Sequence, residues 1–175
     1  MNKCIFLLGL LLVFVSCKDE VKEPLNKPEA VNESFEVALD AVIKNDDSLQ
    51  IFYCENGEIN YDGVKMVWAK VKGSETKQTV KFKFPEDAMP TKMRIDISTN
   101  KDQLPIEFKK FSMKYYDKAY EIKDTMFFQY FIPSHQIEWD RKQAIATFKI
   151  KDGEFFDPQF GSRTNIEEEL TKMFN

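Results

Sequence analysis

The sequence predicts an all-β fold: an antiparallel, jelly-roll-like β-sandwich of about eight strands, with a short helical turn near residues 125–131 and a short C-terminal helix. Apolar residues alternate with polar ones in short runs, which is the period of a half-buried strand. Clusters of Asn, Asp, Gly and Pro separate these runs roughly every ten to twelve residues, as is typical of sandwiches. No internal repeat is visible, which disfavours a propeller or a solenoid.

The apolar runs define the expected strands, and the clearest is the one in which Val80, Phe82 and Phe84 alternate with lysines. Strands are expected at 35–43, 49–54, 64–71, 80–84, 93–97, 106–108, 111–115, 119–122 and 144–150. Lys109 and Lys110 separate two apolar sets that are out of phase, so one extra residue there predicts a β-bulge or a corner. A hairpin turn is expected at 117–118.

Two segments carry helical signals. After Asp124, which can cap a helix, apolar residues at 126, 127, 130 and 131 recur at helical spacing, so we expect one or two helical turns. Thr164 and Glu167 match a capping box and predict a helix from there to about Phe174.

The N-terminus has the composition of a secretory leader. A short basic start precedes thirteen uncharged residues, 4–16, and a membrane-spanning helix needs about 20. Ser16 is the small residue at the end of this segment, and Cys17 follows it directly. The chain then becomes abruptly polar.

This pattern resembles the lipobox of bacterial lipoproteins, although Phe14 stands where Leu is usual. The resemblance implies that residues 1–16 are removed as a signal peptide and that Cys17 is acylated, which makes the membrane a partner through the acyl chains. Lys18-Asp19-Glu20 resembles the surface-export signal of Bacteroidota lipoproteins. We therefore expect an outer-membrane lipoprotein facing the cell surface, with the periplasmic face as the alternative.

Residues 17–33 contain two prolines, many charges and no apolar period, so we expect a flexible tether. Residues 34–175 are expected to form the β-sandwich domain. Cys54 is the one cysteine of that domain, so no internal disulfide is expected, and its apolar setting favours a place in the core. The net charge of −4 disfavours a nucleic-acid partner.

The sequence lacks the motifs of common catalytic sites. His135 is the single histidine, so a zinc site or a histidine-based triad cannot be assembled readily. No nucleotide-binding glycine loop or nucleophile elbow is present. Glu138 and Asp140 form a close carboxylate pair, but 29 acidic residues make such pairs common. We expect no enzyme activity, no cofactor and no metal.

Calcium binding is a weaker alternative. It would require five acidic residues in turns to approach one another, namely Asp46, Asp47, Glu55, Glu58 and Asp62. Solvated turns are the favoured interpretation.

Aromatic residues suggest a binding role, because sugars present apolar faces that stack on rings. Trp139 is surrounded by Glu138, Asp140 and Arg141, so we expect a candidate ligand site there, with a core position as the alternative. Tyr61, in a loop with a glycine, is a second candidate. Trp68 is expected in the core.

Residues 82–115 resemble small sandwich domains of Bacteroidota envelope proteins, which are similar in architecture to carbohydrate-binding modules. The resemblance implies a non-catalytic domain that binds glycan or another envelope component. The alternative is an accessory subunit that docks on a larger outer-membrane protein.

Overall fold

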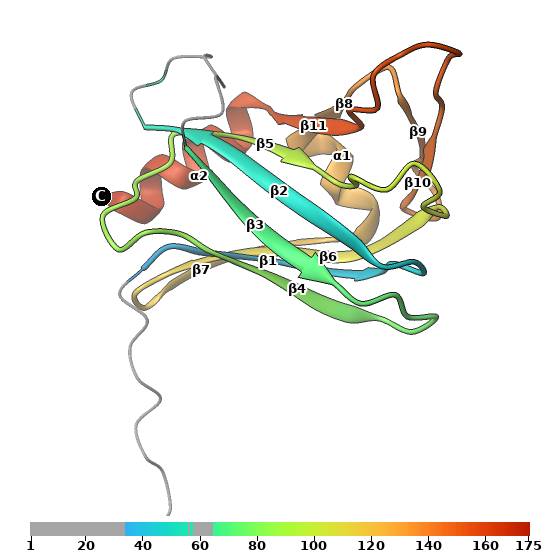
Figure 1. The fold of residues 1–175 in the computed structure, drawn as a ribbon. Helices are drawn as coiled ribbons and strands as arrows, with labels where there is room; N and C mark the ends of the chain where they lie inside the picture. Colours follow the sequence, from blue (N-terminus) through green and yellow to red (C-terminus); the bar gives the residue numbers. More distant parts are fainter. Residues whose placement is uncertain (1–33, 56, 58–64) are drawn as a thin grey trace, which may run out of the picture. The chain divides into compact units, whose positions relative to one another are not determined.

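A computed structural model describes residues 34–55, 57 and 65–175 (Figure 1). Their strands form two antiparallel sheets, which confirms the predicted all-β sandwich. The first sheet has the order β4-β1-β6-β10-β9, and β7 also pairs with β6. Its strands are β1 (Glu36–Val42), β4 (Gln78–Lys83), β6 (Ile106–Tyr115), β7 (Lys118–Lys123), β9 (Ile137–Asp140) and β10 (Ile145–Phe148).

The second sheet has the order β3-β2-β5-β11-β8. Its strands are β2 (Asp47–Cys54), β3 (Met66–Val71), β5 (Lys92–Asp96), β8 (Phe131–Pro133) and β11 (Gln159–Ser162). The short strands β8, β9 and β11 were not expected from the sequence. β8 contains a proline and β11 a glycine, and both residue types weaken the strand signal.

The inner faces of both sheets contribute to one hydrophobic core. In the first sheet, Val37 lies opposite Phe82 and Leu39 opposite Val80, so the predicted alternation does direct these side chains inward. Cys54 is buried, as expected.

The predicted bulge is present in β6. Asp40 of β1 pairs with Lys110, whereas Ala41 pairs with Phe108, which leaves Lys109 as the extra residue. The bulge returns both apolar sets to the core side of one continuous strand. The hairpin after β6 turns at Tyr116 and Asp117, one residue earlier than predicted, because Tyr115 pairs with Lys118.

Both predicted helical segments form. A 3-10 turn, η1 (Asp124–Met126), leads into α1 (Phe127–Tyr130), and α2 is Thr164–Phe174. The predicted caps are wrong: the N-cap positions are Lys123 and Arg163, and neither provides a side-chain cap. Thr164 is already helical, and the Glu167 carboxylate accepts a hydrogen bond from the Ser162 hydroxyl instead. None of the helices in the described residues is long and apolar enough to cross a membrane.

Candidate functional site

The outer face of the second sheet combines exposed apolar side chains with a buried ion pair. Strand pairing aligns one row of four residues across β3, β2, β5 and β11: Trp68, Gln50, Asp96 and Gln159. Neighbours in such a row have Cβ atoms about 5 Å apart and project from the same face. Trp68, at one end of the row, is 53% exposed.

A second row runs beside the first on the same face. It consists of Met66, Phe52, Arg94, Gly161 and Ile132. A Cβ atom at Gly161 would have no neighbour within 4 Å, so the surface beside Arg94 is open. We call these two rows of side chains the platform.

The exposure of Trp68 corrects the prediction that this ring lies in the core. Val67, Ala69 and Val71 are the buried residues of β3, so the alternation of the strand directs Trp68 outward. Nearly every position of this strand is apolar, and periodicity therefore does not distinguish its two faces.

A cleft of about 340 Å³ opens at the end of β5, between the loops that contain residues 98–101 and 155–157. Its floor includes Gln50, Phe52, Arg94 and Asp96 of the platform. Phe155 lines the cleft and is 83% exposed, the most exposed large apolar side chain of the described residues. Its solvent exposure makes it available to a ligand.

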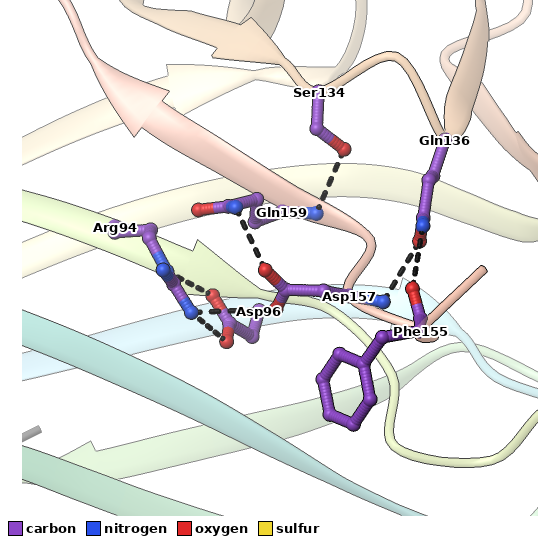
Figure 2. Close-up of polar contacts among 7 residues, drawn as sticks. All are labelled: Arg94, Asp96, Ser134, Gln136, Phe155, Asp157 and Gln159. Carbon is purple, nitrogen blue, oxygen red and sulfur yellow. Dashed lines mark hydrogen bonds and ion pairs between the residues drawn. The ribbon is translucent and has the colours of Figure 1, made fainter.

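The polar centre of the cleft is an arginine held by two carboxylates (Figure 2). The Arg94 Nε donates to Asp96 Oδ1 at 2.8 Å, and one terminal nitrogen donates to Asp96 Oδ2 at 2.7 Å. The same terminal nitrogen lies 3.3 Å from Asp157 Oδ1. The guanidinium carbon also lies 4.6 Å from the centre of the Phe52 ring.

Asp96 is buried, and burial raises its pKa while the Arg94 guanidinium opposes that rise. Removing Arg94 from this carboxylate would leave a buried charge without its counter-ion, which is costly. Arg94 and Asp96 therefore form a fixed unit.

A buried amide holds the loop that carries Phe155. Gln136 is almost fully buried; its Nε2 donates to the Phe155 carbonyl at 2.7 Å, and its Oε1 accepts from the Asp157 N–H at 2.7 Å. Gln159 donates from its side chain to Asp157 at 2.9 Å. In Figure 2 the Phe155 carbonyl faces Gln136 while the ring projects away from it. The loop is thus positioned before any ligand arrives.

The outer face of the first sheet has a different chemistry. It carries lysines paired with acids, as in Lys81 with Glu36 at 3.3 Å and Lys110 with Glu121 at 3.0 Å. Such exposed pairs are typical of a solvated surface. The two outer faces of the sandwich are therefore chemically distinct.

In the structure, the predicted Trp139 site is not an exposed stacking surface. The Trp139 ring is half-buried and packs edge-on against Phe108 and Phe160, with ring centres 5.1 Å and 5.5 Å away. Successive residues of a strand point to opposite faces, so Glu138 and Asp140 project away from this ring.

The polar residues around Trp139 have local partners. Glu138 pairs with Lys149 at 2.9 Å, and the Arg141 guanidinium lies over Phe128 at 4.1 Å. Asp140 accepts backbone hydrogen bonds from residues 142 and 143, which hold its pKa below the ordinary value. The structure does not gather these residues around Trp139. Cys17 and Tyr61 lie outside the described residues.

The acidic turns proposed for calcium are separated. Asp47 and Glu55 flank the two ends of β2, and the Asp47 carboxylate binds Ser98 at 2.6 Å and Gln103 at 2.8 Å. Within the described ranges no group of three His, Cys, Asp or Glu side chains is placed to hold a metal ion. Glu58 and Asp62 are outside those ranges.

Sequence reasoning missed the platform and its cleft. Phe52, Arg94 and Asp96 lie in predicted strands, but Asp157 and Phe155 lie in a segment without a periodic signal. One sequence signal pointed to the site: Arg94 and Asp96 alternate with buried apolar residues in one strand, so both lie on its outer face. No family model, curated protein or solved structure matches this chain.

Proposed function

We propose that this chain is a non-catalytic, lipid-anchored protein of a bacterial outer membrane whose β-sandwich binds glycan on the platform. The observation that carries the proposal is a pair of exposed rings: Phe155 lines a polar cleft, and Trp68 lies opposite Gln50, which also lines it. Binding sites for small ligands combine apolar surface with a few placed polar groups, and this face has both.

The chemistry of the cleft suits sugars. Aromatic rings offer stacking surfaces for the C–H faces of a pyranose. Gln50, Asp96 and Asp157 line the cleft and supply hydrogen-bonding groups for hydroxyls. Arg94 holds both carboxylates in place.

The expected anchor at Cys17 supports the proposal from the sequence. Acyl chains contribute about 0.8 kcal/mol per buried methylene, and two chains hold a protein stably on a membrane. Many copies on one surface would raise the apparent affinity for a polymeric glycan. We place the protein on the cell surface, with the periplasmic face as the alternative.

The first test is glycan binding by the purified full chain in mild detergent. Truncation of one stacking ring, Trp68→Ala, is expected to weaken binding about threefold to tenfold, since a stacked aromatic contributes roughly 0.5–1.5 kcal/mol beyond its buried area. Tyr116→Ala is the matched control, because Tyr116 is 43% exposed but lies in the β6–β7 turn of the other sheet.

A glycan array identifies the ligands, and titration measures each variant. Equal loss in the Trp68 and Tyr116 variants, or retained binding in both, would contradict a site on the platform.

The second candidate is an accessory subunit that docks on a larger outer-membrane protein. The exposed Met66 and Ile132, which flank the same face, favour this candidate because they enlarge its apolar surface. Cross-linking in intact cells followed by mass spectrometry distinguishes the two: a protein cross-linked to the platform in the absence of glycan binding supports docking.

A further inference from the structure

We infer that the platform takes an uncharged, linear oligosaccharide that spans several sugar residues, with Trp68 and Phe155 as its two anchors. This inference rests on the proposed function and specifies the class of glycan. It follows from the separation of the anchors, the charge of the groups between them and the rigidity of the cleft wall.

The path from Trp68 to the centre of the cleft is too long for one sugar. Trp68 is on β3 and Asp96 on β5, with β2 between them, so two strand spacings of roughly 5 Å separate their backbones. The loop that carries Phe155 is tied to Arg94 and Gln159 through Asp157, and the Phe155 ring lines the cleft together with Gln50 and Phe52 of β2. A ligand that stacks on Trp68 and also reaches the Arg94–Asp96 pair in the cleft therefore spans roughly 10 Å, which exceeds one sugar ring.

The surface between the anchors is continuous. Gln50 pairs with both Trp68 and Asp96, and it lines the cleft together with Phe52. Phe52 in turn lies opposite Met66, which is 40% exposed. Apolar surface and hydrogen-bonding groups thus follow one path from β3 into the cleft, as a linear chain requires.

The charges along this path balance. Arg94 and Lys101 face Asp96 and Asp157 in the cleft. An acidic sugar that captured Arg94 would strip the buried Asp96 of its counter-ion, and a cationic group would compete with Arg94 for the same carboxylates. An uncharged ligand leaves this unit intact and hydrogen-bonds through its hydroxyls to polar groups that line the cleft beside it, such as Gln50 and Asp157.

The wall at Phe155 is fixed in advance. The hydrogen bonds from Gln136 to residues 155 and 157 hold the loop, so ordering of this anchor adds little to the entropic cost of binding. Because the anchors are fixed, the distance between them determines the length of the shortest ligand that contacts both. Affinity is therefore expected to rise with chain length until both rings are covered and then to level off.

The experiment uses the full chain in mild detergent and an array of size-graded glucans, mannans, xylans and galactans, from monosaccharide to hexasaccharide. Oligogalacturonate and hyaluronan fragments of the same lengths represent acidic glycans. For the neutral series that binds, hexasaccharide affinity is expected to exceed monosaccharide affinity by roughly threefold to tenfold, because a monosaccharide covers one ring and a hexasaccharide covers both.

Variants test the two anchors separately. Trp68→Ala and Phe155→Ala are each expected to reduce hexasaccharide affinity, whereas a disaccharide loses affinity in no more than one of them. Tyr116→Ala is expected to change neither. A Trp139→Phe background leaves Trp68 as the single tryptophan, so its fluorescence reports a ligand on β3 directly. Circular dichroism confirms that each variant is folded.

The outcomes separate the two levels of the proposal. If none of the glycans on the array binds, the proposed function and this inference are both overturned. Binding that is independent of length, or confined to the acidic series, overturns the inference while glycan binding stands. Length-dependent neutral binding that is unaffected by both anchor variants also overturns it, because the ligand then lies elsewhere.

Discussion

At Gly73 the backbone of the turn after β3 lies against the backbone of the turn between β1 and β2. A Cβ atom there would be 2.3 Å from the Lys44 carbonyl oxygen and under 3 Å from backbone atoms of Asn45. The Gly73 N–H donates to Asp46 at 2.9 Å, and the Ser74 N–H donates to Ile43 at 2.8 Å. The close approach thus joins the end of β3 to the turn between β1 and β2.

Gly73→Ala is expected to destabilise the fold by about 1–3 kcal/mol, because the clashing atoms are backbone and cannot rotate away. Urea unfolding measures the change. Gly161→Ala is the matched control, since its Cβ meets open space and it should change stability little. Equal stability of the Gly73 variant and the native chain would show that the two turns are not held together as described.

At the scale of elements, the cleft depends on the segment between β10 and β11. This segment has no regular structure of its own along residues 154–158, yet Phe156 packs against Phe148 with ring centres 5.7 Å apart. Its backbone is held by Gln136, which lies in the turn before β9. Long-range hydrogen bonds thus hold this segment in place, whereas strand pairing holds the segments within the two sheets.

Gln136→Ala is expected to release the segment, because it removes the acceptor of the Asp157 N–H and the donor to the Phe155 carbonyl. Hydrogen exchange at residues 155–157 should become faster, while the core strands β1 and β6 stay protected. Gln129→Ala serves as the control, because Gln129 is exposed on α1. Unchanged exchange at Asp157 in the Gln136 variant would contradict this role.

At the scale of the whole molecule, the proposed membrane location depends on Cys17, which lies outside the described residues. The apolar leader that ends at Ser16-Cys17 predicts cleavage and acylation at this cysteine. An acylated chain stays with the membrane even when its folded domain has no membrane-spanning helix.

Cys17→Ala is expected to abolish labelling with radioactive palmitate and to release the protein from the membrane fraction or leave it as an unprocessed precursor. Cys54→Ala controls for the presence of a second cysteine, which is buried. Unchanged labelling in the Cys17 variant would refute the lipoprotein prediction.

Local sequence determined much of the sandwich. The alternation of Val80, Phe82 and Phe84 with lysines marked a strand and its buried face, because period two is a property of neighbouring residues. The phase change at Lys109 located the bulge for the same reason. The helix at Thr164–Phe174 was predicted from a capping box, and the helix forms although its N-cap residue is Arg163 and not Thr164.

The candidate site depended on the tertiary structure. The prediction that Trp68 lies in the core was wrong, because five of the six residues of β3 are apolar and only the packing of β3 against the core decided which face is buried. Arg94 and Asp157 are 63 positions apart and meet because β11 pairs with β5. Local pattern carries no information on such pairing. Sequence alone therefore predicted most of the strands, and the packing of the two sheets decided which side chains share a surface.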